Sequence, residues 1–107
     1  MHRDQQMNLG LLFPLLRPGG WYVVEDIHSS FQNKYDEKPG SAGTTHSVVS
    51  RFNRTGAMVS RHISDGQRAY LERWIAFAYP VVTRGYRTDQ TCLIRKRLPS
   101  EVREGQT

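Results

Sequence analysis

Two adjacent acidic residues, Glu25 and Asp26, are the side chains whose type and position most clearly allow chemistry. They directly follow Trp21–Val24, an apolar run that favours a β-strand. Ligands of open α/β sheets bind beyond the carboxyl ends of strands, and paired carboxylates offer the hard oxygen ligands that Mg²⁺ takes. A metal there could act as a Lewis acid and lower the pKa of a hydroxyl bound to it. We therefore consider both residues candidate metal ligands, although such a pair is also common in a solvated turn, with Asp26 capping a following helix.

Other side chains with chemical potential are histidines and the single cysteine. His28 follows Asp26 by two residues and could add an imidazole to the same site or contact substrate, although a lone histidine in a loop is more often simply exposed. His46 and His62 belong to no recognisable motif. Cys92 stands among apolar residues, which predicts a buried and unreactive thiol. No residue is assigned a catalytic role.

An amphipathic helix should precede the strand that leads to the acidic pair. Asp4 is a suitable N-cap, and Pro14 should distort the last turn because it lacks an N–H. Residues 17–20, Arg-Pro-Gly-Gly, should end the helix, since proline disfavours helix before it and glycine allows positive φ. The apolar residues expected to form its buried stripe are Met7, Leu11, Leu12, Leu15 and Leu16.

The run Trp21–Val24 has no polar alternation, which predicts a strand buried on both faces, as in the centre of a parallel sheet. Aromatic residues are expected in the core rather than on a ligand-stacking surface, namely Trp21, Tyr22, Trp74 and Phe77. Downstream, the sequence predicts a mobile loop at 28–47. Two helices should follow, a short one at 48–59 that is weakened by Gly56 and one at 65–73 that is capped by Asp65. Two antiparallel strands are expected near 74–79 and 91–94, joined by a loop at 80–90.

Residues 12–31 read Leu-Phe-Pro-Leu-Leu-Arg-Pro-Gly-Gly-Trp-Tyr-Val-Val-Glu-Asp-Ile-His-Ser-Ser-Phe. This run resembles the stretch between the fourth helix and the fifth strand of class I S-adenosylmethionine-dependent methyltransferases. Its acidic pair is similar to that of the metal-dependent O-methyltransferases of macrolide and sugar tailoring. Segments 74–79 and 91–96 resemble the closing antiparallel strands of that family more loosely.

The resemblance implies methyl transfer from S-adenosylmethionine to a hydroxyl of a small molecule or sugar. It also implies that Glu25 and Asp26 hold Mg²⁺ or a similar divalent cation, with His28 near the substrate. The family carries a histidine after an Asp-Gly-Ser turn close to the position of His2. That turn is missing here, so we do not transfer the role of general base to His2.

The implied fold is α/β, a partial Rossmann-like methyltransferase fold that ends in an antiparallel strand pair. Residues 1–98 would be the C-terminal half of the domain and 99–107 a polar tail. The Gly-rich turn that holds the cofactor has no counterpart, since Gly19 and Gly20 lack the Gly-x-Gly-x-x-Gly spacing. The chain is therefore expected to be a truncated part, without its own cofactor-binding residues. Uncovered apolar surface would then favour self-association or a complementary chain.

Length, composition and charge exclude several classes of protein. The 107 residues suffice for one domain, and one cysteine excludes a disulfide framework and a Cys-rich zinc module. No apolar stretch is long enough for a bilayer and no signal-peptide core follows the start, so the cytoplasm is the expected location. The net charge of +5 would suit nucleic acid, but the basic residues are scattered. Two alternatives stay open: an interaction module pairing through a sheet edge, and a small basic nucleic-acid-binding domain.

Overall fold

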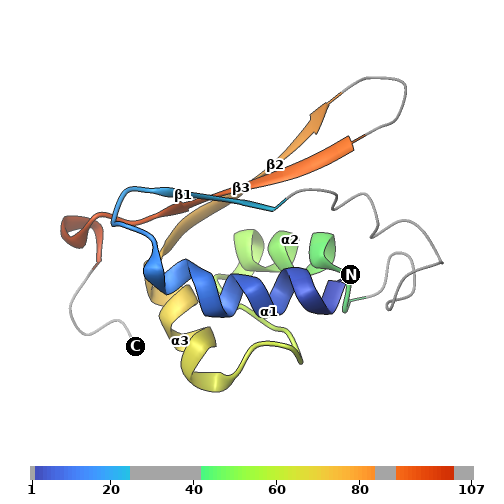
Figure 1. Cartoon of the computed structure of the whole chain (residues 1–107), viewed down its shortest axis with the longest axis horizontal. Coiled ribbons are helices and arrows are strands. Elements are labelled where there is room, and N and C mark those ends of the chain that lie inside the picture. Colours follow the sequence, from blue (N-terminus) through green and yellow to red (C-terminus); the bar gives the residue numbers. More distant parts are fainter. Residues whose placement is uncertain (1, 25–41, 84–88, 103–107) are drawn as a thin grey trace.

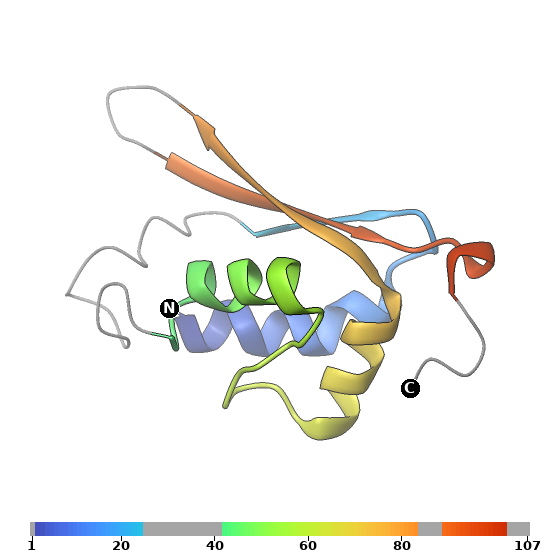
Figure 2. The same ribbon diagram turned by 180° about the vertical axis from the view of Figure 1, so that it is seen from behind.

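The computed structural model describes residues 2–24, 42–83 and 89–102 as one sheet with helices on one side of it (Figure 1). The sheet is antiparallel with strand order β1-β3-β2. The opposite view shows the same two layers, with the second face of the sheet uncovered by these helices (Figure 2). The elements are α1 (His2–Leu12), η1 (Phe13–Leu15), β1 (Trp21–Val24), α2 (Thr45–Thr55), α3 (Asp65–Trp74), β2 (Ile75–Thr83), β3 (Asp89–Lys96) and η3 (Pro99–Glu101).

The predicted end of the first helix is confirmed. At Pro14 the α-helix gives way to the 3-10 turn η1, where the N–H of Leu16 donates to the Phe13 carbonyl at 3.0 Å. Gly19 has φ of 80°, a conformation that L side chains rarely adopt. The predicted cap is wrong, because α1 already begins at His2 and Asp4 lies inside its first turn.

The predicted buried stripe of α1 is also wrong. The side chains that α1 and η1 bury are His2, Gln6, Leu9 and Phe13, whereas the predicted stripe is exposed at Met7 (40%), Leu11 (57%), Leu12 (48%) and Leu15 (79%). Leu16 alone is partly buried against the core. The polar face can turn inward because hydrogen-bond partners meet it there, as described below.

β1 forms where predicted, but it is neither buried on both faces nor part of a parallel pair. It pairs antiparallel with β3, with Trp21 opposite Arg95 and Val24 opposite Cys92. Val24 is buried, while Trp21 and Val23 are about half exposed (48% and 50%). The apolar and polar residues of β1 do not alternate because both faces of the strand carry apolar side chains. The described helices cover only one of these two faces.

The downstream elements differ from prediction mainly at their ends. α2 begins at Thr45, inside the segment predicted as loop, because the Thr44 hydroxyl accepts from the Ser47 N–H. It stops before Gly56, whose φ of 75° ends it four residues earlier than predicted. In α3 the cap is Ser64 rather than Asp65, in a reciprocal capping box with Gln67.

The antiparallel pair of late strands is confirmed, and both strands are longer than predicted. β2 continues to Thr83 and β3 starts at Asp89, so most of the predicted loop at 80–90 is strand. Pro80 did not stop β2, since proline is tolerated in a strand at a position whose N–H would not serve the ladder. Part of the predicted tail forms η3.

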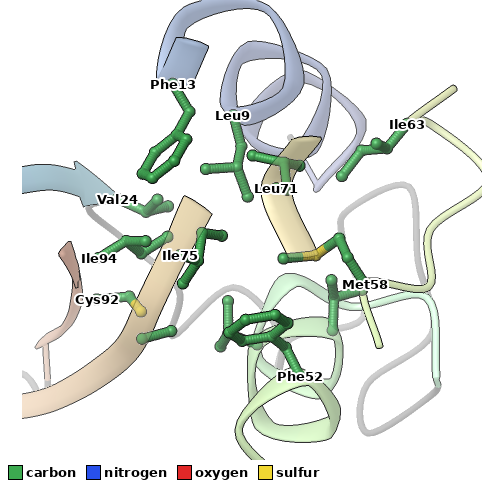
Figure 3. Packing of buried hydrophobic residues seen from close by; sticks show 13 residues of the cluster. Leu9, Phe13, Val24, Phe52, Met58, Ile63, Leu71, Ile75, Cys92 and Ile94 are labelled. Atoms are coloured by element: carbon green, nitrogen blue, oxygen red, sulfur yellow. The ribbon is translucent and has the colours of Figure 1, made fainter. Parts of the chain in front are cut away.

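The core lies between the sheet and the three helices (Figure 3). Phe13, Leu71, Ile75 and Ile94 are fully buried, and each comes from a different element. Tyr22 and Trp74 pack partly buried against this cluster, as predicted, whereas Trp21 and Phe77 do not join it. Val24 of β1 belongs to the same cluster as Leu9 of α1 and Leu71 of α3, so the core ties β1 to both helices.

Candidate functional site

The residues that the sequence singles out for chemistry, Glu25, Asp26 and His28, lie outside the described part of the chain. The structure describes β1 up to Val24, which is buried and paired with Cys92. The chain leaves β1 at the same end of the molecule at which α1 and α2 begin (Figure 1). The first turns of these two helices are therefore the described helical elements at that end of the molecule.

A buried polar network joins those first turns. His2 is fully buried, and its Nδ1 accepts a hydrogen bond from the Thr45 N–H at 3.3 Å. The Thr45 hydroxyl donates to Oε1 of Gln5 at 2.6 Å. Since Nδ1 of His2 accepts from a backbone donor, the neutral ring carries its proton on Nε2.

Gln6 extends the network in two directions. Its Nε2 donates to the Gly43 carbonyl at 2.9 Å, and its Oε1 accepts from the Ser60 hydroxyl. The start of α2 is thus held by α1 and by the segment that follows α2. These roles were not predicted from the sequence, although Thr44 before an apolar stretch is a recognisable helix-cap signal.

Lys96 holds the segment that leads into β1. Its side chain is 3% exposed, and its Nζ donates to the Leu16 carbonyl at 2.8 Å and the Pro14 carbonyl at 3.3 Å. Nζ also donates to the Tyr70 hydroxyl at 2.6 Å. Three rings surround the ammonium, with centroids 5.0 to 5.6 Å away: Phe13, Tyr70 and Trp74.

The main chain of Lys96 fixes the turn between α1 and β1. Its N–H donates to the Gly20 carbonyl at 2.9 Å, and its carbonyl accepts from the Gly19 N–H at 3.0 Å. Lys96 therefore holds the Pro-Gly-Gly turn through its backbone, and the carbonyls of Pro14 and Leu16 through its side chain. These contacts lie at the Trp21 end of β1, so they position the start of the strand.

The uncovered face of the sheet carries aromatic side chains. Trp21 and Phe77 meet edge to face at 5.7 Å, and Phe77 meets Tyr79 at 6.3 Å. Arg95 lies between Trp21 and Phe77 in the sheet register. Its guanidinium forms a double hydrogen bond with Glu101, at 2.8 and 3.1 Å, so this cation is already engaged within the chain.

Burial or pairing shifts the pKa of Cys92, Tyr22 and Glu101, which lie in the sheet or beside it. Burial raises the pKa of the Cys92 thiol to about 11, in keeping with the predicted unreactive cysteine. Desolvation also raises the pKa of Tyr22. Hydrogen bonds from Arg95 and the Leu98 N–H lower the pKa of Glu101 to about 2.

Within residues 2–24, 42–83 and 89–102 no three His, Cys, Asp or Glu side chains gather as metal ligands would. In the same part of the chain, none of the helices has the length and apolar character needed to cross a bilayer. Comparison with protein-family models, with curated proteins and with solved structures found no match.

Proposed function

We propose that this chain is the C-terminal portion of an S-adenosylmethionine-dependent O-methyltransferase that acts on a hydroxyl of a small molecule or sugar. The observation that carries the proposal is the run at residues 12–31, in which a helix, a Pro-Gly-Gly turn and an apolar strand lead directly to Glu25 and Asp26. The described geometry is compatible with it: α1, η1, the turn and β1 follow in that order, and an antiparallel pair closes the sheet.

The proposal assigns Glu25 and Asp26 to a divalent cation such as Mg²⁺. Their carboxylates are the oxygen donors this ion prefers, and their place just after β1 suits a ligand at the end of a strand. When bound, the ion would act as a Lewis acid on the substrate hydroxyl. S-adenosylmethionine itself would be held by a complementary half of the domain, with His28 available to contact substrate.

The remaining described residues would serve this site by positioning. The Lys96 cluster fixes the start of β1, and Phe13 meets Tyr22 edge to face at 6.3 Å in the middle of the strand. The network around His2 and Thr45 fixes the helix starts near the strand's end.

Titration of the full chain with Mn²⁺, followed by electron paramagnetic resonance, tests the metal assignment. We expect saturable binding that falls by about tenfold or more when Glu25→Gln and Asp26→Asn are combined, because oxygen ligands are lost. Asp65→Asn, at an acidic side chain that is 98% exposed, is the matched control and should leave the affinity unchanged. Equal affinity of the double variant and the wild type would remove these residues from the metal site.

Calorimetry with S-adenosylmethionine, with and without Mg²⁺, tests the placement of the cofactor. We expect no heat of binding from the chain alone and binding once a Gly-rich half is supplied. Binding by the chain alone would contradict that placement.

The nucleic-acid alternative draws little support from Arg95 and Lys96, the two described cations of β3. Sheet aromatics can stack bases, but they need phosphate-binding cations beside them. Arg95 is paired with Glu101, and Lys96 is buried under the sheet. The interaction-module alternative would need an edge strand of the sheet, β1 or β2, that can pair with a strand of a partner.

A further inference from the structure

A groove lies between the C-terminal end of α2 and the first half of β2. Its volume is about 530 Å³, within the range of sites that take small organic ligands. The residues that line it belong to the described part of the chain and include no acidic side chain. Three aromatic residues and one cation are among them, namely Phe52, Phe77, Tyr79 and Arg97. This lining shares no residue with the metal site assigned above.

The groove does not admit a further β-strand. The side-chain amide of Asn53 donates to the Ala78 carbonyl, and its oxygen accepts from the Ala78 N–H at 3.1 Å. These are the two backbone groups that Ala78 would offer to a neighbouring strand. Nε of Arg97 likewise donates to the Ile75 carbonyl at 3.1 Å. Because the strand edge is engaged at both positions, the groove suits a small molecule rather than a peptide backbone.

Arg97 brings to the groove a positive charge that the described acids do not balance. Its Nη1 donates to the Glu101 carbonyl at 3.4 Å, and its Nη2 has no acceptor among the described residues. The Glu101 carboxylate forms a double hydrogen bond with Arg95, so one described acid serves two guanidinium groups at this end of β3. A ligand carboxylate would supply Nη2 with a charge-assisted hydrogen bond and would balance the second guanidinium.

The other walls of the groove favour a flat, apolar ligand body. Phe52 belongs to the core, whereas Phe77 and Tyr79 are 38% and 60% exposed and meet edge to face at 6.3 Å. The space beside Gly56 is open, since no atom lies within 4 Å of the place that a Cβ would take. Aromatic rings stack or meet edge to face with other rings, so the exposed rings offer a planar ligand favourable contacts.

We propose that this groove binds a small aromatic carboxylate, with its carboxylate on Nη2 of Arg97 and its ring system against Phe77 and Tyr79. A carboxylate carries a single negative charge, which matches the one guanidinium that lacks a described acid. The site is argued from the groove alone and does not depend on the proposed methyl transfer, so each can fail without the other.

Titration of the isotope-labelled full chain with 2-naphthoate, followed by two-dimensional NMR, tests the site. We expect saturable shifts of the Gly56, Ala76 and Phe77 amides, with a dissociation constant on the order of 1 mM or below for a probe of this size. 2-Naphthamide keeps the rings and removes the charge. It should bind about tenfold more weakly or worse, because it cannot form a charge-assisted hydrogen bond with Arg97.

Two variants, each with a matched control, separate the charge from the rings. Arg97→Gln should weaken 2-naphthoate binding by about tenfold or more, whereas Arg68→Gln, at an arginine of α3 outside the groove, should not. Tyr79→Ser keeps the test independent of the contact between Arg97 and Ile75. It should weaken binding by about threefold or more, whereas Val23→Thr, at a half-exposed strand residue outside the groove, should leave the affinity unchanged.

Four results would overturn the inference. They are the absence of saturable binding to the folded chain, equal affinity for 2-naphthoate and 2-naphthamide, shifts confined to amides outside the groove, and full affinity in both Arg97→Gln and Tyr79→Ser. Far-UV circular dichroism checks that each variant is folded before its affinity is compared with that of the wild type.

Discussion

At the scale of single residues, Lys96 joins parts of the chain that are distant in sequence. Its ammonium reaches two carbonyls at the end of η1 and the hydroxyl of Tyr70 in α3. Its partners among the described residues are neutral oxygens and aromatic rings, so the free energy of the arrangement comes from charge-assisted hydrogen bonds and ring contacts. Without these hydrogen bonds and ring contacts, burial of the Lys96 ammonium would cost free energy.

Lys96→Met keeps a long side chain but removes every donor. We expect the free energy of unfolding to fall by about 2 kcal/mol, because the Pro14 and Leu16 carbonyls lose a charged donor in a partly buried place. Urea-induced unfolding measures the change. Tyr70→Phe is the matched control: it keeps the ring and removes one acceptor, so the loss should be clearly smaller. An unchanged or higher midpoint for Lys96→Met would show that Lys96 does not stabilise the turn.

The position of Lys96 could have been anticipated better than its contacts. Cys92 and Ile94 precede it at steps of two, and a strand places such residues on one face. The basic run at 95–97 hides this alternation. The contacts themselves depend on η1, the residue after it and α3, which no local pattern in β3 encodes. The assignment of Glu25 and Asp26 stays a prediction, since these residues lie outside the described part of the chain.

At the scale of elements, the helix ends that Pro and Gly determine could be predicted from the sequence, whereas the buried face of α1 could not. Gly19 and Pro14 end the first helix as their backbone preferences dictate. The prediction that α1 buries its leucines was wrong because apolar periodicity shows only that one face of a helix is more apolar than the other. It does not show which face is buried. Here His2 and Gln6 meet buried partners in the chain around α2, so the polar face could be buried without loss of hydrogen bonds.

η3 offers a test at this scale, because one carboxylate docks it on β3. The folded pKa of Glu101 is about 2, below the ordinary 4.5, so the carboxylate stabilises the folded state above pH 4.5. That contribution is lost as the pH falls through about 2. We therefore expect the urea midpoint of wild type to exceed that of Glu101→Gln near neutral pH and the difference to shrink between pH 4.5 and 2. Ser100→Ala, in the same turn, should follow the wild-type pH profile. A difference that does not vary with pH would contradict the docking role.

At the scale of the whole molecule, one small core lies on one face of the sheet, and the described side chains on the other face do not join it. A domain of this length has a stability of roughly 5–15 kcal/mol. Each fully buried residue is therefore a large share of the total. The neighbours Phe13 and Leu15 in η1 show the contrast most clearly: Phe13 is fully buried, and Leu15 is 79% exposed.

The variants Phe13→Ala and Leu15→Ala test which of these two side chains belongs to the core, through the free energy of unfolding that each loses. Phe13 touches the Lys96 ammonium and the Tyr22 ring, so its truncation opens a cavity between η1 and β1. We expect a loss of about 3–5 kcal/mol, enough to remove most of the cooperative unfolding transition. Leu15→Ala, which the helical spacing alone would rank as equally damaging, should change the stability by about 0.5 kcal/mol or less. Comparable losses for the two variants in urea unfolding would mean that η1 buries Leu15 as well as Phe13.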